Sequence, residues 1–479
     1  RKPDMSDCCA TSRKDDVYDL AVIGAGSAGF SAAITAAEQG ARVALIGHGV
    51  IGGTCVNVGC VPSKTMIRAG EALHGARTAS RFDGIVGEAR IIDWRRVIAA
   101  KDDLVVGLRQ KKYIDLLPQY EGVSYVEGKA RLADGGVAVG DHFVRAPKIV
   151  ITTGARPAVP PIPGIDRVSS LTSTSLLELD VLPKSLIVVG GGFIGAELAQ
   201  MMARMGVAVT VVCRSRLLPQ AEPEVSEALM DVFRREGIQL YCGVAYDACR
   251  EDAAGITLCV KDEGERIELR AEKLLIATGR APNVEGLGLA EAGVAQDERG
   301  AIAVDAHMRT SRAGVYAAGD VTNRDQFVYM AAYGAKLAAR NALGSDTLAY
   351  DNAAMPWVVF TDPQVAGVGL TEAQAAAAGH EVKVSVVPLD QVPRALAARD
   401  TRGLIKLVAD AGADRLLGGQ ILAPEGADAI QTLALALKHA MTARALGDTI
   451  FPYLTTVEGL KLAAQGFERD VAKLSCCAG

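Results

Sequence analysis

One motif occurs twice in this chain of 479 residues and restricts the folds that it can adopt. Near Leu20 and again near Leu186, an apolar segment leads into a glycine-rich turn, a helical stretch and a second apolar segment. The first glycine of such a turn permits a tight bend, the second lets backbone N–H groups approach a pyrophosphate, and the third lets the helix pack closely on the strand. These glycines are Gly24, Gly26 and Gly29 in the first copy, and Gly190, Gly192 and Gly195 in the second. Two copies 166 residues apart predict two dinucleotide-binding folds, one for a hydride donor and one for an acceptor.

Length and composition favour an α/β enzyme of several domains. A chain of 479 residues is too long for one hydrophobic core, and its size predicts roughly three domains. Its 51 glycines are typical of α/β chains with many tight strand-to-helix turns. A net charge of -5 without long Lys/Arg runs argues against nucleic acid as a partner.

The longest apolar run, residues 20–37, resembles a membrane span or a signal peptide in composition. Its acidic flank (Asp15, Asp16 and Asp19) and its internal glycines predict a buried strand, turn and helix instead. We therefore expect no membrane span and a soluble, cytoplasmic protein. Ten cysteines in such a chain indicate reduced or catalytic thiols rather than a disulfide framework.

Later segments complete the predicted layout. Residues 148–154, 273–279 and 315–320 are expected to be short apolar strands that end in glycine. From about Tyr350 the pattern changes to alternating strands and an Ala/Leu-rich helix around residues 426–446, which predicts an α+β domain. The predicted division is a flexible tail (1–16), a first dinucleotide domain in two parts (17–170 and 280–349), a second dinucleotide domain (171–279) and a C-terminal domain (350–479).

The residues after Val212 indicate which dinucleotide the second fold prefers. An acid at this strand end usually binds the ribose hydroxyl of NAD, whereas arginine accommodates the 2′-phosphate of NADP. The chain has Arg214 and Arg216 there and no acid, so we expect NADPH. The alternative is that both arginines are solvated surface residues.

A cysteine pair follows the first glycine-rich turn in the segment Cys55-Val-Asn-Val-Gly-Cys60. Its members are close enough in sequence to bridge if the segment forms a helical turn. Pro62 and the helix-forming run after it place Cys60 near a predicted helix N-terminus, where the dipole favours thiolate. A structural zinc site is disfavoured because it would need further Cys or His residues at ligand spacing, and none lies nearby.

With these motifs, residues 17–479 resemble the flavin-dependent pyridine nucleotide-disulfide oxidoreductases. The resemblance implies that the first glycine-rich turn and Asp320 bind FAD and that the second turn binds the nicotinamide cofactor. It implies that Cys60 touches the isoalloxazine, that Cys55 is the interchange thiol, and that Lys64 and Glu197 form an ion pair beside the flavin. Further cofactor contacts are expected at Gly53, Thr54, Gly154 and Gly279.

The C-terminal segment indicates the branch of the family. Disulfide-reducing members carry a His-Pro-Thr motif and a Glu five residues after the His, which protonate the leaving thiolate. This chain has Phe451 and Thr456 at those positions, and it nearly ends in Cys476 and Cys477. Vicinal thiolates suit a soft d¹⁰ ion. The tail therefore resembles that of the mercuric reductase branch.

In that branch, the terminal pair of one subunit passes Hg(II) to the inner pair of its partner. The resemblance therefore implies a homodimer and a Hg(II) site at Cys55, Cys60, Cys476 and Cys477. Two assisting tyrosines are expected at Tyr113 and Tyr453. The alternatives are that Tyr113 is a packed helix residue and that the terminal thiols are merely reactive.

The resulting hypothesis is NADPH-dependent reduction of Hg(II) to Hg(0) through FAD and the inner dithiol. Its rivals are a disulfide reductase with a displaced proton donor and a flavoprotein that sequesters Hg(II) without reducing it. Gly47 departs from the family, which has an acid there for the FAD ribose, so His48 or a backbone contact is required as a substitute. The chain lacks the N-terminal metal-binding motif of many mercuric reductases, and Cys8 and Cys9 are either a rudimentary ion-capture site or incidental thiols.

Four further cysteines lie in the predicted second dinucleotide domain. They are interpreted as structural or surface thiols rather than ligands: Cys213, Cys242, Cys249 and Cys259.

Overall fold

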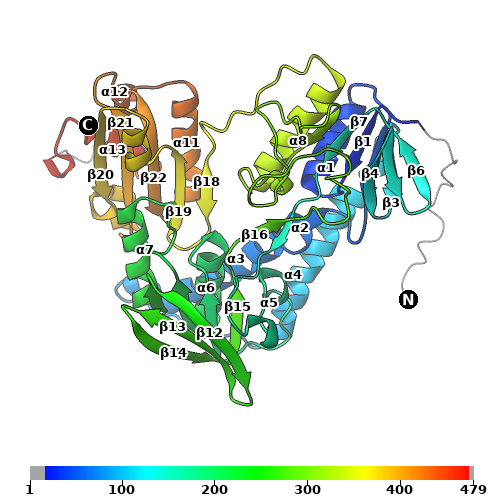
Figure 1. The fold of residues 1–479 in the computed structure, drawn as a ribbon. Coiled ribbons are helices and arrows are strands. Elements are labelled where there is room, and N and C mark those ends of the chain that lie inside the picture. Colours follow the sequence, from blue (N-terminus) through cyan, green and yellow to red (C-terminus); the bar gives the residue numbers. More distant parts are fainter. Residues whose placement is uncertain (1–16, 474–479) are drawn as a thin grey trace. The chain divides into compact units, whose positions relative to one another are not determined.

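The computed structural model describes residues 17–473. These residues divide into two compact units (Figure 1). The first comprises residues up to 62, 99–157 and 280–350, and the second comprises 63–98, 158–279 and the chain from 351. The predicted terminal features, Cys8, Cys9, Cys476 and Cys477, lie outside the described residues. The division into a tail and three domains stays a prediction.

The first unit is built on a five-stranded parallel sheet in the order β17-β7-β1-β2-β3. Its strands are β1 (Leu20–Ile23), β2 (Val43–Gly47), β3 (Val123–Glu127), β7 (Lys148–Ile151) and β17 (Val315–Ala317). The apolar run at 20–37 is thus β1 followed by helix α1 (Ser27–Ala37), as predicted. Helix α8 (Val328–Leu343) packs against α1, where Ser31 donates a hydrogen bond to the carbonyl of Ala332 at 2.8 Å.

A small antiparallel sheet lies beside this layer and closes its other apolar surface. It consists of β4 (Ala130–Ala133), β5 (Gly136–Val139) and β6 (His142–Arg145). Leu132, Val137 and Val144 from these strands share one buried cluster with Ile23 and Ile46 of the parallel sheet. Burial on both sides explains why the parallel strands are almost entirely apolar.

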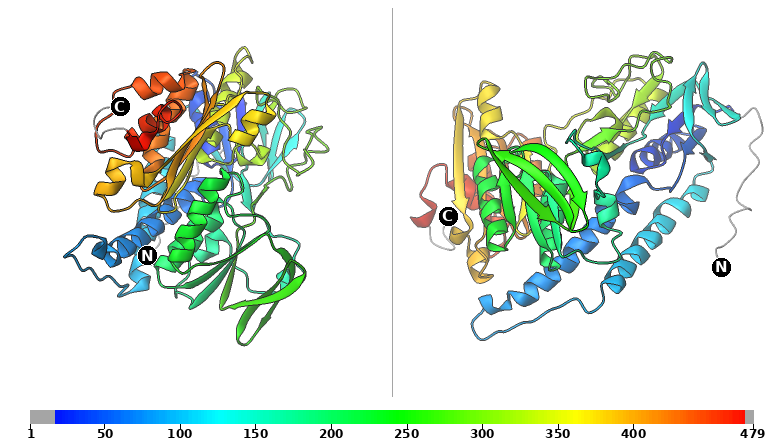
Figure 2. Two further views of the ribbon diagram at one scale, coloured as in Figure 1. Left: turned by 90° about the vertical axis from the view of Figure 1, so that its left-hand side faces the viewer. Right: turned by 60° about the horizontal axis from the view of Figure 1, so that its bottom comes forward.

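The second unit repeats the plan with a four-stranded parallel sheet in the order β11-β10-β9-β15. Its strands are β9 (Ser185–Val189), β10 (Ala208–Cys213), β11 (Gln239–Cys242) and β15 (Lys273–Ile276), with helices α6 (Phe193–Arg204) and α7 (Pro223–Arg235). An antiparallel sheet of β12 (Ala245–Asp252), β13 (Gly255–Asp262) and β14 (Glu265–Ala271) is visible as a separate green layer in Figure 2.

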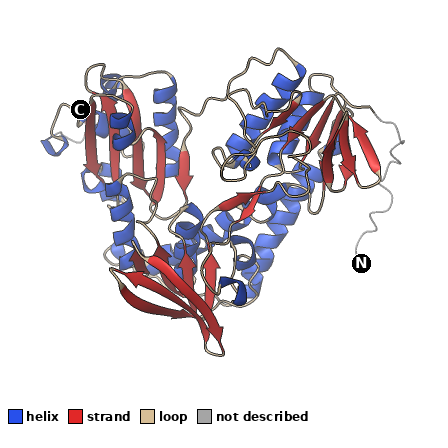
Figure 3. Cartoon of the chain, viewed as in Figure 1, coloured by secondary structure: helices blue, strands red, loops and turns tan. Residues whose placement is uncertain are grey.

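The C-terminal part of the second unit is an antiparallel sheet with helices, which confirms the α+β expectation (Figure 3). Its strand order is β18 (Trp357–Val359), β19 (Gln364–Gly369), β22 (Leu416–Ala423), β21 (Leu404–Asp410) and β20 (Val382–Pro388). Helices α11 (Gly426–Lys438), α12 (Ala443–Asp448) and α13 (Glu458–Gln465) pack on this sheet around one buried apolar cluster.

The prediction of one helix over residues 426–446 is wrong. Helix α11 ends at Lys438, and Ala440 adopts a left-handed backbone conformation with φ +51°. A new helix, α12, begins at Ala443 because the Thr442 hydroxyl caps it by accepting a hydrogen bond from the backbone N–H of Ala445. No helix of the described part of the chain is long and apolar enough to cross a membrane.

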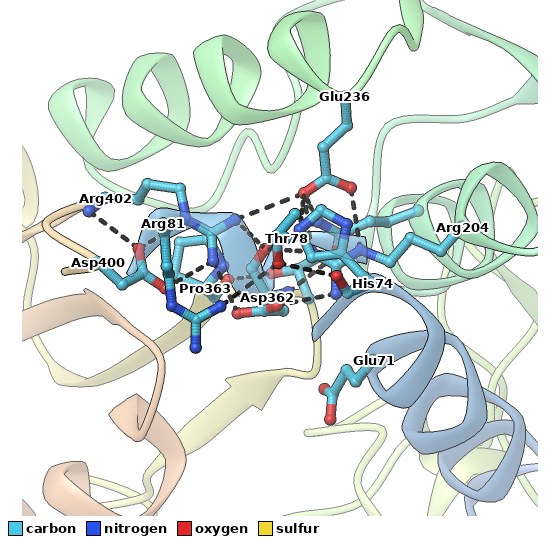
Figure 4. Close-up of polar contacts among 12 residues, drawn as sticks. Glu71, His74, Thr78, Arg81, Arg204, Glu236, Asp362, Pro363, Asp400 and Arg402 are labelled. Atoms are coloured by element: carbon cyan, nitrogen blue, oxygen red, sulfur yellow. Dashed lines mark hydrogen bonds and ion pairs between the residues drawn. The ribbon is translucent and has the colours of Figure 1, made fainter. Parts of the chain in front are cut away.

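A partly buried network of charged side chains joins several elements of the second unit (Figure 4). Arg204, at the end of α6, donates two hydrogen bonds to Glu236 at 2.9 and 2.7 Å, one to the Asp362 carboxylate at 2.8 Å and one to the Asp362 carbonyl at 3.1 Å. Arg402 bonds both carboxylate oxygens of Asp400 at 2.7 Å and also reaches Asp362 at 3.3 Å. Burial, with the charge of Arg204, lowers the pKa of His74 on helix α3 (Cys60–Arg77), which lies 3.9 Å from Glu236.

Replacing Arg204 with alanine is expected to destabilise the second unit by about 1.5–3 kcal/mol, because the half-buried carboxylates of Glu236 and Asp362 lose their shortest charged hydrogen bonds and keep only the longer contacts with Arg402, at 3.5 and 3.3 Å. The Arg204 side chain is 4% exposed. A matched control is Arg234→Ala, whose 48% exposed side chain pairs with Glu227 and Asp231 and should cost about 0–1 kcal/mol. Urea unfolding, followed by circular dichroism, compares them. Equal shifts of the two midpoints would contradict this role for the network.

Candidate flavin and pyridine nucleotide sites

The first glycine-rich turn connects β1 to α1 and leaves no room for side chains. Gly24 has φ +118°, and a Cβ there would lie 2.4 Å from the carbonyl oxygen of Thr152. A Cβ on Gly29 would lie 1.7 Å from the carbonyl oxygen of Gly24. Gly26 precedes α1, and among the described residues no side chain caps this helix. This geometry fits a phosphate at the first N–H groups of the helix, and binding of a dinucleotide there stays a prediction.

A second helix N-terminus lies beside this turn. Helix α2 (Gly53–Asn57) begins where Gly53, with φ +67°, lies against Gly26, so that a Cβ on Gly53 would be 2.6 Å from the Gly26 Cα. A β-bridge pairs Gly26 with Gly52. Gly53, Thr54 and Cys55 therefore begin α2 directly beside the first turn, which is the placement that cofactor contacts at Gly53 and Thr54 require.

The inner cysteine pair spans two helices rather than one continuous helix. Cys55 lies in α2, the chain leaves helical geometry at Val58, and Cys60 begins α3. Both cysteines are half-buried. The expectation that Cys60 stands at a helix N-terminus is confirmed, and this position favours the thiolate through the helix dipole.

Tyr113 lies close to this pair within the first unit. It belongs to a π-helical turn at Gln110–Ile114, its hydroxyl is 3.1 Å from that of Ser27, and its ring meets Phe30 edge-on at 4.8 Å. Burial raises the pKa of Tyr113, and the nearby Cys55 and Cys60 raise it further. Tyr113 is therefore both a packed residue and a neighbour of the dithiol. Because its pKa is raised, its hydroxyl keeps its proton at neutral pH.

Asp320 lies beyond the end of β17, as the motif predicted, and pairs with a residue that the sequence analysis did not select. The Arg280 Nε lies 3.6 Å from the Asp320 carboxylate, and Arg280 also donates a hydrogen bond to the carbonyl of Ala155. Burial raises the pKa of Asp320, and Arg280 partly offsets this. Arg280 could have been selected from the sequence, because it directly follows Gly279 at the end of a predicted strand. Gly154 has φ +72° with open space at its Cβ position.

The second glycine-rich turn, between β9 and α6, has the same geometry. A Cβ on Gly190 would lie 2.3 Å from the carbonyl oxygen of Ala277, and one on Gly195 would lie 2.1 Å from that of Gly190. Gly192 precedes α6, has no side-chain cap among the described residues, and faces open space. Gly279 has φ +118° and open space at its Cβ position. This turn therefore also fits a pyrophosphate.

Lys64 and Glu197 form the ion pair that the resemblance implied. The Lys64 Nζ lies 2.7 Å from Glu197 Oε2, and the other carboxylate oxygen accepts a hydrogen bond from the backbone N–H of Phe360 at 2.9 Å. Glu197 is buried in α6, whereas Lys64 stays partly exposed over the ring of Phe360. The backbone bond fixes the carboxylate, so that the position of the lysine charge is defined.

The two arginines after β10 differ in their environments. Arg214 is exposed. Arg216 is half-buried and donates hydrogen bonds to the carbonyls of Pro219 and Ala221 at 3.1 and 2.6 Å. Arg216 thus holds its own loop, and Arg214 is the more accessible of the two for a 2′-phosphate.

Gly47 ends β2 in a crowded position. A Cβ there would lie 2.6 Å from Ala25 Cβ and 3.0 Å from the Tyr125 hydroxyl. The space beside Gly47 that an acidic side chain would enter is therefore occupied by Ala25 and Tyr125. His48 is exposed at the next position.

The two positions that are predicted to replace the proton-donating motif lie in the second unit. Phe451 packs against the C-terminal apolar cluster, and the Thr456 hydroxyl donates a hydrogen bond to Glu425. Tyr453 is largely exposed in the turn between them.

Comparisons with known proteins agree with this geometry. Residues 18–339 match the family model described as pyridine nucleotide-disulphide oxidoreductase, and residues 355–464 match the model of its dimerisation domain. The chain belongs to the pyridine nucleotide-disulphide oxidoreductase family. It is therefore an α/β oxidoreductase of a family that uses a flavin and a pyridine nucleotide.

Several relatives within this family are named mercuric reductase. The one from Streptomyces lividans is 46% identical over 96% of this chain and 98% of its own length. The one from Shigella flexneri is 47% identical over 96% of this chain and 82% of its own length. Among solved structures, the HOCl-induced flavoprotein disulfide reductase of Escherichia coli is 30% identical, with a TM-score of 0.83 over 94% of this chain and 99% of that one.

If Asp320 holds the flavin, Asp320→Ala should weaken flavin binding roughly 10- to 150-fold, the equivalent of about 1.5–3 kcal/mol for a lost charged hydrogen bond. Asp134→Ala is the matched control, because Asp134 is fully exposed in the same unit. Equilibrium titration of each apoprotein with FAD measures the effect. An Asp320→Ala protein that binds flavin as tightly as the Asp134→Ala protein would exclude this role.

Proposed function

We propose that the protein reduces Hg(II) to Hg(0) with electrons from NADPH, delivered through FAD and the dithiol of Cys55 and Cys60. The observation that carries the proposal is the 46–47% identity to mercuric reductases over 96% of the chain. A cytoplasmic location is part of the proposal, because NADPH and reduced thiols are both maintained there.

The residues of the chain fit this chemistry. The uncapped starts of α1 and α6 are suited to the pyrophosphates of FAD and NADPH, and Arg214 to the 2′-phosphate that distinguishes NADPH. When bound, FAD would supply the two-electron transfer that links NADPH to the metal ion. Lys64, fixed by Glu197, would place a positive charge beside the flavin, and Asp320 would hold its ribityl chain.

The metal ion would be held by sulfur. Cys60 at the start of α3 and Cys55 in α2 would bind Hg(II) as thiolates, which are soft ligands for a soft ion. Tyr113 beside them, protonated at neutral pH, would orient the metal or a departing ligand without adding negative charge. After accepting two electrons, the metal leaves as Hg(0).

The region of Phe451 and Thr456 favours a metal ion over a disulfide as substrate. Disulfide reduction requires an acid to protonate the leaving thiolate. A phenylalanine ring has no proton to donate, and the hydroxyl of Thr456 is engaged with Glu425. Reduction of Hg(II) needs no proton at this position.

Delivery of the ion would involve two subunits. The match to a dimerisation domain supports a homodimer formed through the C-terminal domain, from about residue 350. In this arrangement Cys476 and Cys477 of one subunit pass Hg(II) by thiolate exchange to Cys55 and Cys60 of the other, assisted by Tyr453.

The activity is tested by following NADPH oxidation with HgCl₂ in excess thiol and, separately, with glutathione disulfide or lipoamide. We expect oxidation with Hg(II), accompanied by volatile Hg(0), and little oxidation with either disulfide. Turnover of the disulfides alone would favour a disulfide reductase. Stoichiometric uptake of Hg(II) without NADPH oxidation would favour a sequestering flavoprotein.

Delivery by the tail is tested with a Cys476→Ala, Cys477→Ala double variant. Its turnover of thiol-complexed Hg(II) should fall by about 10-fold or more, the equivalent of at least about 1.4 kcal/mol, because the ion loses its dithiolate carrier. Reduction of ferricyanide, which takes electrons from the flavin directly, is the control and should stay unchanged. Full Hg(II) turnover by the double variant would refute delivery by the tail.

The role of Tyr113 is tested with Tyr113→Phe, which keeps the ring contact with Phe30 and removes only the hydroxyl. We expect kcat with Hg(II) to fall while flavin content stays at the wild-type level. Tyr120→Phe, on the same unit, serves as the control. Equal kcat values for the two variants would assign Tyr113 a packing role only.

A further inference from the structure

Two cysteines outside the proposed site lie side by side in the second unit. Cys213 is the last residue of β10 and Cys242 is the last residue of β11, and the parallel register places them opposite each other. Their sulfur atoms are 3.2 Å apart. Both stand at the carboxyl end of the sheet, the end at which ligands bind in open α/β folds.

The backbone geometry at this pair permits a disulfide. Neighbouring strands are about 4.8 Å apart, which falls within the range of about 4.4–6.8 Å that disulfides span between Cα atoms. Residues paired in register direct their side chains to the same face of a sheet. The sulfurs need to approach by only about 1 Å to reach the bond length of about 2.05 Å, and rotation of the side chains can supply this.

The two thiols have different chemical environments. The hydrogen bond from Cys213 lowers the pKa of Cys242, and the backbone N–H of Leu217 and the charge of Arg234 add to this, while burial and Glu227 oppose it. The same hydrogen bond, together with burial, raises the pKa of Cys213, which is 3% exposed and also lies 3.1 Å from the carbonyl oxygen of Ser215. Cys242 is half-buried, so it is both the more accessible thiol and the better source of thiolate.

The neighbouring cysteines lack this arrangement. Cys249 pairs with Leu258 across β12 and β13, whereas Cys259 pairs with Ala248, so the two sulfurs lie on opposite faces of that sheet. Burial raises the pKa of Cys249 to about 11. They serve as an internal comparison for Cys213 and Cys242.

Cys213 and Cys242 do not form a structural metal site with other described residues. Within residues 17–473, no group of three or more His, Cys, Asp or Glu residues is placed to hold a metal ion. A structural zinc centre needs four such ligands. Two adjacent thiols that are joined by a hydrogen bond, which lowers the pKa of one of them, are instead suited to exchange with disulfides.

We propose that Cys213 and Cys242 form a second thiol–disulfide pair, which low-molecular-weight disulfides such as glutathione disulfide oxidise. The Cys242 thiolate attacks one sulfur of the disulfide and releases one thiolate. Cys213 then loses its proton, and its sulfur attacks Cys242 Sγ and releases the second thiolate. One disulfide is thereby reduced to two thiols, and the protein gains one disulfide by losing two electrons and two protons.

The pair is tested in the full-length protein, incubated with glutathione and glutathione disulfide at increasingly oxidising ratios. After acid quenching, alkylation and digestion, mass spectrometry should detect a linked Cys213–Cys242 peptide whose yield rises with the ratio, while Cys249 and Cys259 remain alkylated. Absence of the linked peptide at the most oxidising ratio would overturn the proposal. Equal oxidation of Cys249 or Cys259 would overturn it too, because it would mark unspecific oxidation.

Two variants test the assigned roles. Cys213→Ser should retain a glutathione adduct on Cys242, and Cys242→Ser should leave Cys213 with at least about 10-fold less adduct, because Cys213 is only 3% exposed and burial disfavours its thiolate. The reverse pattern would refute the assignment of Cys242 as the attacking thiol. If either serine variant fails to fold, the titration of the wild-type protein still decides whether the pair forms. Neither result depends on Hg(II) reduction.

Discussion

The close approach of helix and strand at the two glycine-rich turns is the constraint on which the rest of the structure depends. At each turn, the third glycine packs against the carbonyl oxygen of the first, and any Cβ would overlap with it. This contact brings the uncapped start of α1 or α6 to the carboxyl end of its parallel sheet. A phosphate can then bind to backbone N–H groups, and the side chains nearby remain available for other roles. In the first unit, α2 begins against the same turn, which brings Cys55 to it.

The proposed chemistry depends on two features: the dithiol of Cys55 and Cys60, and the expected lack of an acid at Phe451 and Thr456. The thiolate-favouring helix start at Cys60 is present, whereas Phe451 and Thr456 stand at the positions where we expect the proton donor of a disulfide reductase. A soft metal ion accepts electrons while bound to thiolates and needs no proton from the protein. In the function that we propose, the absence of an acid at these positions therefore restricts the substrate to a metal ion, while Cys55, Cys60, Lys64 and Glu197 keep their roles in electron transfer.

The second unit uses its buried polar groups in two ways. In the network of Arg204, Arg402, Glu236, Asp362 and Asp400, every charge lies beside an opposite one, so the network orders the elements that carry it. Cys213 and Cys242 are instead thiols at the ends of neighbouring strands. They lie against the second glycine-rich turn, because a Cβ on Gly191 would be 3.0 Å from the Cys213 sulfur. A reaction at this pair would therefore take place against the turn that we propose binds the pyridine nucleotide.

The sequence by itself determined the features that depend on local backbone geometry. The two glycine-rich turns, the strand and helix at residues 20–37, and the helix start at Cys60 could all be predicted, because glycine sterics and helix N-terminal preferences act over a few residues. The tertiary structure alone decided which distant residues meet. It paired Arg280 with Asp320, turned Arg216 onto its own loop, filled the space at Gly47 with Tyr125, and placed Cys242 opposite Cys213, 29 residues away. The reason is that such contacts depend on strand order and register, and a slip of one residue would turn each side chain to the other face of its sheet.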